Sequence, residues 1–484
     1  MFPFSASVSE DQLRDKPEDI NNTPESRHED GVDGRVRREP LLRRLRATFW
    51  PAWISRDIGF LLVARSSMSA VRALASIVVP IYLALLGFNA LLLGILFTAT
   101  ALVSAAMSSL IGLLSDRFGR KLFIVVIPLL TALASLVFAV SQVAGLLFVF
   151  AALGSFGRGS GAGAGAIGPY QPAEQALLAD KIPPRHRNSL FGRVAFASSL
   201  GALIGTGPLL ALSQLLAGSG GFTSYHVDFV VQAAFAMLAG LLAIPVTETR
   251  HPRAARPEGD VVRRRLRSPV SRQSWSILLR LWITNSINGL AVGFFGPFVT
   301  YWFYRRYGVG PTQIGILFSI INFAALIANL SAAPLAARLG LVRAILVSRM
   351  LQAILLVPMV LAPAFWQAGA VYLVRMMVQR LGLPLRQSYV MGVVPAEERA
   401  SVGALSNLPS QATSSFSPTF AGYIFDHISI SLPFEIGALF QAVNALLFFI
   451  FFRNLPPPEE QNIQRPEQGQ LQESFPNTAE RGIP

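Results

Sequence analysis

The sequence predicts an all-α, polytopic membrane protein with twelve transmembrane helices in two six-helix halves. Of its 484 residues, 52% are hydrophobic and only 14% are charged, whereas soluble domains carry roughly 25% charged residues. Apolar runs of about 20 residues, the length that a helix needs to cross a bilayer core, recur along the chain. A polar, arginine-rich stretch then splits the apolar part into two nearly equal halves. This composition excludes a disordered chain and argues against a soluble enzyme.

The polar segments divide the chain into five parts. We expect residues 1–56 to be a disordered cytoplasmic segment with a basic end, and residues 454–484 to be a disordered cytoplasmic tail. The stretch 248–275 is expected to be a basic linker between an N-terminal half, 57–247, and a C-terminal half, 276–453. No apolar stretch stands at the N-terminus, so we expect no cleaved signal peptide.

Each half contains six apolar segments that we predict to be membrane spans. They cover residues 58–87, 90–114, 122–140, 144–166, 190–216 and 227–246, and then 277–304, 314–336, 341–361, 365–384, 402–424 and 430–452. An even number of spans places both termini on the same side of the membrane. Basic residues gather in the loops on the side of the linker, and the opposite loops hold almost none apart from Arg305 and Arg306. The positive-inside rule therefore predicts cytoplasmic termini, and we expect the plasma membrane.

The strongly basic balance has a topological explanation. The formal net charge is 41 − 27 = +14, which in a soluble protein would suggest nucleic-acid binding. Because the basic residues lie in short segments between apolar runs, we expect no nucleic-acid partner. Cysteine is absent, which excludes disulfides and thiolate metal sites. The sequence has neither an H-E-x-x-H motif nor a phosphate-binding loop, so we expect no enzyme activity, no cofactor and no metal.

The two halves resemble each other in sequence. A shift of 384 − 172 = 212 residues pairs Pro172 with Pro384 and Gln175 with Gln387, both just after or at the end of the fourth span of each half. The same shift pairs Pro183 with Pro395, Arg187 with Arg399, and Ser189 with Ser401. Internal repeats of this kind are typical of transporters built from two six-helix halves.

The loop after the second span carries a specific motif. It consists of Gly112, Asp116, Arg117, Gly119, Arg120 and Lys121 in the run GLLSDRFGRK. This run resembles the loop 2–3 motif G-x-L-x-D-R-x-G-R-K of the major facilitator superfamily, and the resemblance extends over residues 57–453. It implies that the loop latches the two halves together on the cytoplasmic side and releases them during transport. Glycine permits close backbone approach, and Asp116 can pair with an arginine or a helix N-terminus. A purely topogenic turn is the alternative.

The fifth span carries a second motif. Its glycines and proline are Gly192, Gly201, Gly205, Gly207 and Pro208. The spacing resembles the superfamily's antiporter motif G-x8-G-x3-G-P, with the Gly-Pro pair displaced by two residues. The resemblance implies efflux by antiport, whereas ordinary packing of small residues is the alternative.

Polar residues inside the spans are candidates for a substrate cavity. They include Arg72, Arg158, Asn285, Asn288, Arg375 and Gln379. Polar side chains inside a membrane are costly and usually face a cavity or a partner. The asparagines and the glutamine could equally join helices by hydrogen bonds. Within the predicted spans the carboxylates are only Asp228 and Glu435, near the outer ends, which weakens the case for proton coupling.

Three functions remain open at the level of sequence. The first is a secondary active transporter that exports small molecules by alternating access in exchange for protons. The second is a transporter of organic anions or phosphate esters that uses Arg72, Arg158 and Arg375. The third is a receptor or scaffold that does not transport. The expected partners are a small-molecule substrate, protons and the lipid bilayer, and the protein is expected to be a monomer.

Overall fold

A computed structural model describes residues 54–156, 168–182, 186–217, 222–248, 271–328, 341–394 and 405–455, together with residues 398 and 402. From residue 53 onward the chain forms one compact unit. The predicted terminal tails and most of the predicted linker lie outside the described residues.

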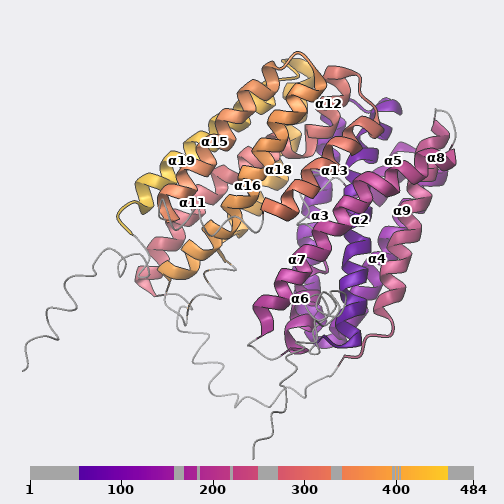
Figure 1. The fold of residues 1–484 in the computed structure, drawn as a ribbon, viewed down its shortest axis with the longest axis horizontal. Coiled ribbons are helices and arrows are strands. Elements are labelled where there is room, and N and C mark those ends of the chain that lie inside the picture. The colour runs from indigo at the N-terminus through magenta and orange to yellow at the C-terminus, as the bar shows by residue number, and fades with distance from the viewer. Residues whose placement is uncertain are drawn as a thin grey trace, which may run out of the picture. The chain divides into compact units, whose positions relative to one another are not determined.

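Helices make up both halves of the described chain, and no strand occurs among these residues. The first group contains α2 (Arg56–Leu85), α3 (Ala90–Phe118), α4 (Arg120–Val140), α5 (Ala144–Gly154), α6 (Gln171–Asp180), α7 (Arg187–Ile204), the π-helical turn η2 (Gly205–Leu209), α8 (Leu210–Ala217) and α9 (Phe222–Ala243). The second group contains α11 (Arg272–Phe295), the short helix η3 (Gly296–Phe298), α12 (Val299–Tyr307), α13 (Pro311–Ala328), α15 (Leu341–Leu361), α16 (Phe365–Val393), α18 (Leu408–His427) and α19 (Leu432–Phe452). Figure 1 shows the long helices of each group running side by side.

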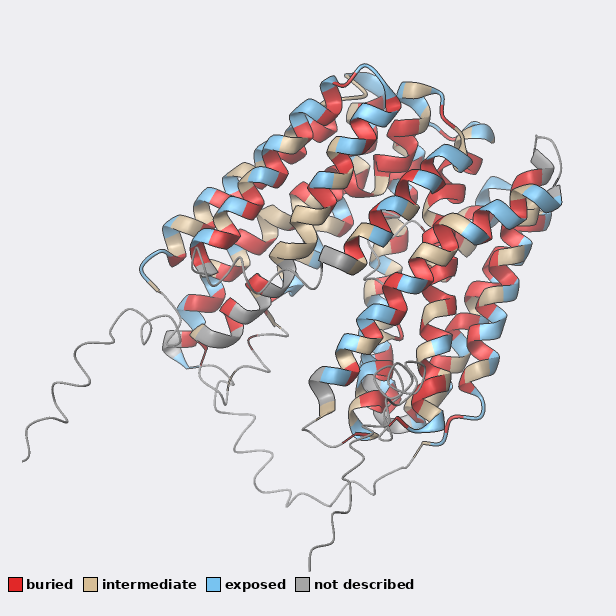
Figure 2. Ribbon diagram, in the orientation of Figure 1, coloured by how far each residue is buried: buried red, intermediate tan, exposed pale blue. Residues whose placement is uncertain are grey.

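The helices have the length and surface of membrane spans. Among the described residues, 8 helices are long and apolar enough to cross a bilayer, and α5 and α13 contribute shorter apolar stretches. Large apolar side chains such as Leu133, Leu241 and Ile354 are exposed on the outside, and Figure 2 shows exposed positions recurring along the helices. Exposed apolar surface of this extent suits lipid rather than water. The prediction of an all-α polytopic membrane protein is therefore confirmed.

Local sequence fixes where many helices begin and end. Ser55 and Asn89 cap α2 and α3, because each side-chain oxygen accepts a hydrogen bond from the backbone N–H three residues later. Gly119 separates α3 from α4 with φ +98°, a conformation that favours glycine. Ser155 ends α5 in the left-handed region with φ +56°.

The ends of three helices differ from the predicted boundaries. The fourth predicted span runs over 144–166; α5 ends at Gly154, where Ser155 adopts the left-handed conformation, and residues 157–166 lie outside the described residues. The predicted linker reaches 275, but α11 begins at Arg272 because Ser271 caps it through the N–H of Ser274. The tenth predicted span stops at 384, whereas α16 continues to Val393 and carries Arg386, which lines a polar cavity.

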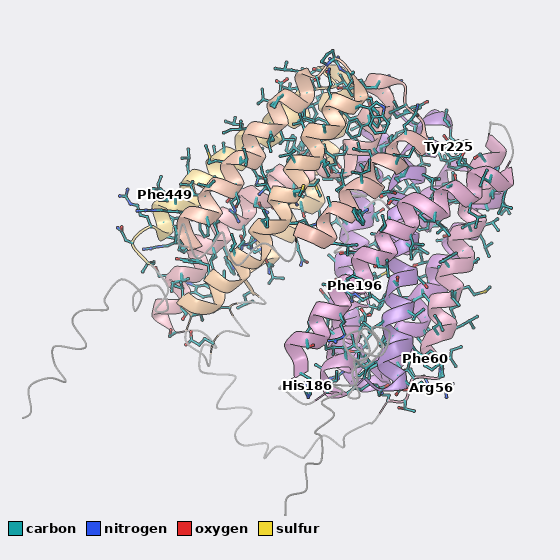
Figure 3. The ribbon with its side chains drawn as sticks, in the orientation of Figure 1. Arg56, Phe60, His186, Phe196, Tyr225 and Phe449 are labelled. Carbon is teal, nitrogen blue, oxygen red and sulfur yellow. The ribbon has the colours of Figure 1, made fainter. Side chains whose placement is uncertain are left out.

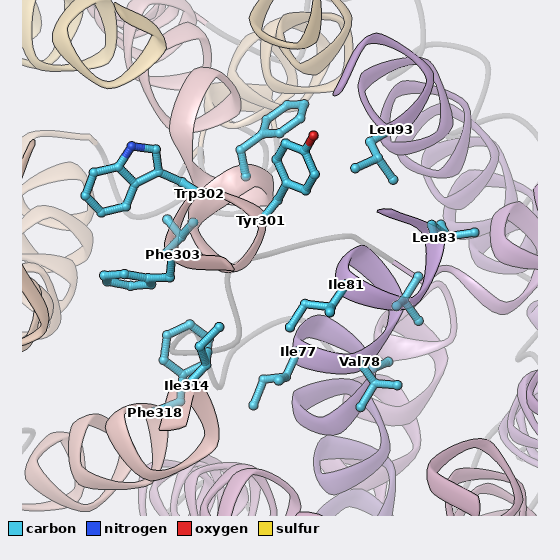
Figure 4. Packing of buried hydrophobic residues seen from close by; sticks show 14 of the residues in the cluster. Ile77, Val78, Ile81, Leu83, Leu93, Tyr301, Trp302, Phe303, Ile314 and Phe318 are labelled. Carbon is cyan, nitrogen blue, oxygen red and sulfur yellow. The ribbon is translucent and has the colours of Figure 1, made fainter. Parts of the chain in front are cut away.

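Each group has its own packing, and the two groups also touch. In the first group α2 packs against α7 and α9, and α4 against α9; in the second, α11 packs against α18 and α19, and α15 against α16 and α19. Between the groups, α3 packs on α18, α13 on α7, and α12 on α2. One apolar cluster spans this junction, and Figure 4 shows Ile77 and Ile81 of α2 near the helices that carry Phe303 and Ile314.

Candidate functional site

Two names are used for the ends of the helices. The linker side is where α9 ends at Ala243 and α11 begins at Arg272, and the far side is where α2 ends at Leu85 and α3 begins at Ala90. At the linker side, Arg56 lies over the ring of Phe60, 5.5 Å from its centroid (Figure 3).

The loop 2–3 motif lies at the linker side of the first group. The backbone N–H groups of Arg120 and Lys121 donate to the two carboxylate oxygens of Glu248, at 2.8 and 3.2 Å. The guanidinium of Arg120 also forms an ion pair with Asp180. A carboxylate at a helix N-terminus stabilises the helix, so Glu248 fixes the start of α4.

For the other residues of the loop 2–3 motif, the structure describes mainly the backbone. Asp116 and Arg117 lie in the last turn of α3, and their side chains are outside the described atoms. A Cβ on Gly112 would meet nothing within 4 Å. We expected the glycines of this motif to permit close backbone approach, and no such approach occurs at Gly112. At position 119 the backbone has a positive φ, which favours glycine. The latch that the resemblance implies for Asp116 stays a prediction.

A second polar cluster ties together three helices of the first group at the linker side. The ammonium of Lys181 donates to Asp57 at 2.6 Å and to the carbonyl of Thr247 at 2.5 Å. The backbone N–H of Thr247 donates to the same carboxylate at 3.1 Å. These contacts join the start of α2 to the ends of α6 and α9.

A buried ion pair lies inside the first group. Arg65 pairs with Glu174, and their side chains are 5% and 2% exposed. The Nε of Arg65 donates to the hydroxyl of Ser198 at 2.7 Å. The sequence alone does not predict this pairing, because α2 and α6 are far apart along the chain. The charge of Arg65 is therefore already neutralised by the protein.

The candidate Arg72 lies in α2 and contacts the end of α5. One guanidinium nitrogen of Arg72 donates to the carbonyl of Ser155 at 3.2 Å. Gly168 has φ +119°, and a Cβ there would lie 2.2 Å from Arg72. The positive φ favours glycine at 168, and a side chain there would displace the guanidinium of Arg72. Arg158 lies outside the described residues.

The glycine motif of the fifth span makes close helix contacts. A Cβ on Gly201 would lie 2.0 Å from the carbonyl oxygen of Ser66, and one on Gly205 would lie 2.2 Å from that of Ala70. Gly207 faces Ser319 of the second group, where a Cβ would lie 2.8 Å from the hydroxyl oxygen. Gly205, Gly207 and Pro208 form the π-helical turn η2. A Cβ on Gly192, by contrast, would meet nothing within 4 Å.

A polar cavity of about 70 Å³ lies inside the second group. It is lined by α11, α15, α16 and α19, through Asn288, Val292, Ser348, Arg349, Gln352, Arg375, Gln379, Gly382, Arg386 and Gln441. Three of the predicted cavity residues, Asn288, Arg375 and Gln379, are therefore brought together. None of the lining side chains is acidic.

The contacts of the cavity arginines are mostly with neutral groups. Arg375 donates to the side-chain oxygen of Gln379 at 3.5 Å, and its guanidinium lies 4.3 Å from the centroid of the Phe295 ring. Arg349 donates to Asn444 at 2.7 Å. The amide of Asn444 in turn donates to Asn288 at 3.3 Å.

Sequence reasoning missed several cavity residues. Arg349, Gln352 and Gln441 lie within predicted spans, so the signal of a polar residue in an apolar segment was available for each. Arg386 lay beyond the predicted end of its span. Asn285, in contrast, was proposed for the cavity but is bonded at 2.5 Å to the carbonyl of Ser406. Asn285 thus joins α11 to the segment before α18. Among the described residues, no cluster of acidic or histidine side chains could hold a metal ion.

The two groups meet through polar contacts near the far side. The carboxylate of Asp426, near the end of α18, accepts from the backbone N–H groups of Ala90 and Leu91 at 3.0 and 2.8 Å. The hydroxyls of Thr98 and Thr419 lie 2.7 Å apart. Additional bonds join Thr300 to the carbonyl of Ser76 and Ser319 to Thr206.

Glycines bring α3 and α18 close enough for these bonds. A Cβ on Gly94 would lie 2.3 Å from the carbonyl oxygen of Pro418, and one on Gly422 would lie 2.3 Å from that of Ala90. The backbones therefore touch directly, as they do in membrane helix pairs with small residues at the contact.

The family of the chain can now be stated. A family model described as Major Facilitator Superfamily matches residues 61–284 and 281–479. The chain belongs to this superfamily. It is therefore a multi-pass membrane transporter and not an enzyme.

Several known proteins are similar to the chain. An uncharacterized membrane protein of Saccharomyces cerevisiae is 21% identical over 82% of this chain and 94% of its own length. The multidrug resistance protein MdtG of Citrobacter koseri is 26% identical over 57% of this chain and 64% of its length, so the match spans less than two thirds of MdtG. The quinolone resistance protein NorA of Staphylococcus aureus is 22% identical over 76% of this chain and 90% of NorA.

Solved superfamily structures share the fold. A D-xylose–proton symporter has a TM-score of 0.62 and 16% identity, covering 85% of this chain and 98% of that one. The nucleoside transporter NupG has a TM-score of 0.60 and 14% identity, covering 82% of this chain and 100% of its own. At these identities the likeness concerns the fold alone.

Proposed function

We propose that the protein is a secondary active transporter that exports small drug-like molecules by alternating access, in exchange for protons. Its twelve spans would form halves 57–247 and 276–453, and the termini and the linker would lie in the cytoplasm at the plasma membrane. The names of the relatives MdtG and NorA support drug export. The glycine-rich contact between α7 and α2 supports the resemblance to the antiporter motif.

The observation that carries this proposal is the chemistry of the contact between α3 and α18. Its bonds are a surface carboxylate on backbone N–H groups, a pair of threonine hydroxyls, and close glycine contacts. Hydrogen bonds of this kind can be exchanged for bonds to water at modest cost. A junction without buried ion pairs can therefore open and close, which alternating access requires.

A disulfide across this junction tests the proposal. The chain contains no cysteine, so an introduced pair reacts without competition. Replacing Thr98 and Thr419 with cysteine places two thiols where the hydroxyls lie 2.7 Å apart. Oxidation should abolish quinolone export from cells or vesicles, and reduction should restore it, because the far side can no longer open.

A cysteine pair within one group provides the matched control. The hydroxyls of Ser104 and Ser155 lie 2.6 Å apart and both belong to the first group. Oxidising this pair should leave export unchanged, since halves that move as rigid bodies keep that distance. Unchanged export in the cross-linked Thr98→Cys, Thr419→Cys protein would overturn alternating access at this junction. A scaffold would export nothing in any state.

Proton exchange requires a carboxylate that can change its protonation state. Glu174 is committed to Arg65, whereas the fully buried Asp228 accepts hydrogen bonds from Ser213 and, at 3.4 Å, from Gln214. Neither partner carries a charge, so Asp228 is the favoured proton site within the described spans. Replacing it with asparagine should uncouple export from a pH gradient. Export that ignores the gradient in the unmodified protein would rule out the proton step.

A further inference from the structure

We infer that the cavity of the second group is an anion subsite that binds a carboxylate or phosphate group of the transported molecule. The use of the subsite in transport rests on the proposed function, whereas anion binding itself does not. The chemical class follows from three features of the cavity: its charge, the unmet hydrogen-bonding capacity of its arginines, and its size.

The charge of the cavity is uncompensated. Arg349, Arg375 and Arg386 line one space, and the other lining residues are neutral. Within the described part of the chain, Arg349, Arg375 and Arg386 contact no carboxylate in any ion pair or hydrogen bond that the structure resolves for them; their resolved side-chain hydrogen bonds go to Asn444, Gln379, Met376 and Asn407. Buried charges in proteins are normally paired because an unpaired ion is costly to remove from water. A bound anion would supply the missing partner.

Arg375 has N–H donors that are not used in short hydrogen bonds to the described atoms. It is 1% exposed, and its Nε has no hydrogen-bond partner within the described atoms. The bonds of its Nη1 are long, at 3.5 Å to Gln379 and 3.8 Å to the sulfur of Met376. A guanidinium carries five N–H donors in a planar fork. Carboxylate and phosphate oxygens match that fork and accept two bonds at once.

Neighbouring side chains complete a site for an anion. Arg349 is 6% exposed, and its guanidinium donates to Asn444 and lies 5.1 Å from the centroid of the Phe448 ring. Arg386 donates to Asn407 at 2.9 Å. Both arginines are therefore oriented by neutral groups that leave their charge uncancelled. An anion between them would also relieve the repulsion among like charges.

The size of the cavity limits what it can hold. A water needs on the order of 10–15 Å³ measured in this way, so a space of about 70 Å³ accommodates a carboxylate or a phosphate group. A whole drug-sized molecule needs a pocket of roughly 300–1,000 Å³. We therefore assign the cavity to the anionic end of a larger substrate.

Binding to the purified full-length protein tests the inference. Benzoate, benzamide and inorganic phosphate would be titrated at constant ionic strength, with the melting temperature and calorimetric heat as readouts. Benzoate or phosphate should stabilise the protein and neutral benzamide should not, because a ligand stabilises the state that it binds. No stabilisation by either anion would overturn the inference.

Matched arginine variants locate the site. Arg375→Gln should weaken anion binding by about tenfold or more, because it removes charge-assisted hydrogen bonds. Arg375→Lys keeps the charge without the fork and should bind with intermediate affinity, which also guards against a variant that fails to fold. Arg343→Gln removes an exposed arginine from the same helix as Arg349 and should bind like the unmodified protein. Equal binding by Arg375→Gln and Arg343→Gln would overturn the assignment.

Transport assays separate a substrate group from a free inorganic ion. If the cavity holds part of the substrate, aromatic carboxylates should inhibit export by the unmodified protein and inhibit the Arg375→Gln variant far less. Anion binding with no effect on export would overturn the assignment to the substrate while leaving alternating access intact. If the oxidised Thr98→Cys, Thr419→Cys protein still exported its substrate and anion binding were retained, the proposed function would be overturned instead.

Discussion

The two helix groups bury their arginines in different ways. In the first group, Arg65 is held by Glu174 and Ser198 inside the bundle. In the second group, Arg349 and Arg375 are equally buried but are held by amides and aromatic rings. The same side chain thus has a structural role where the protein supplies the counter-charge, and is available to a ligand where it does not.

The largest effect should come from breaking the neutralised pair. Glu174→Gln leaves Arg65 buried without a counter-charge, and removing one partner of a buried pair typically costs about 3–5 kcal/mol. Thermal unfolding in detergent should show a strong loss of stability. The double variant Arg65→Gln, Glu174→Gln should recover much of that loss, because no isolated charge remains. A double variant as unstable as the single one would contradict a role based on charge.

Removing a buried arginine from the second group should not reduce thermal stability. Arg375→Gln removes a buried charge that has no carboxylate partner among the described residues, so thermal stability without ligand should stay the same or rise. Its effect should appear only as lost stabilisation by benzoate. If Arg375→Gln destabilised the ligand-free protein as much as Glu174→Gln does, the contrast between the two groups would be wrong.

This contrast marks the limit of what the sequence could predict. Hydropathy and charge predicted the membrane class and located the long helices, and the run from Gly112 to Lys121 indicated the superfamily. Arg72 and Arg375 looked alike as arginines near the middle of a span. Only the fold shows that Arg65 meets Glu174, because that pairing depends on how helices pack. Arg349 was missed although it lies near the middle of its span, because no motif drew attention to it.

A smaller effect should separate two glycines of the fifth span. Gly205→Ala would force a Cβ to within 2.2 Å of the backbone oxygen of Ala70, whereas Gly192→Ala meets open space. Overpacking of this kind usually costs about 1–3 kcal/mol, while alanine at an open helical position is favoured by up to roughly 1 kcal/mol. Thermal unfolding should therefore fall for the first variant and hold or rise for the second. Equal stability of the two would show that the contact between η2 and α2 can relax.

The smallest effect concerns a feature that the two groups share. Glu248 caps the start of α4 in the first group, and Glu398 accepts from the N–H and the hydroxyl of Ser271 at the start of α11 in the second, at 3.0 and 3.2 Å. The nearby hydroxyl of Ser274 and the hydrogen bonds from Ser271 hold the pKa of the Glu398 carboxyl below its ordinary value of 4.5.

A carboxyl whose pKa is lowered by folding stabilises the folded state above its unfolded pKa, and the stabilisation is lost as the pH falls through the folded pKa. Glu398→Gln should therefore melt slightly below the unmodified protein at pH 7, and the two melting curves should converge under acid conditions. A difference for Glu398→Gln that persists unchanged in acid would mean that the cap acts through shape, and that the charge at the start of α11 contributes nothing.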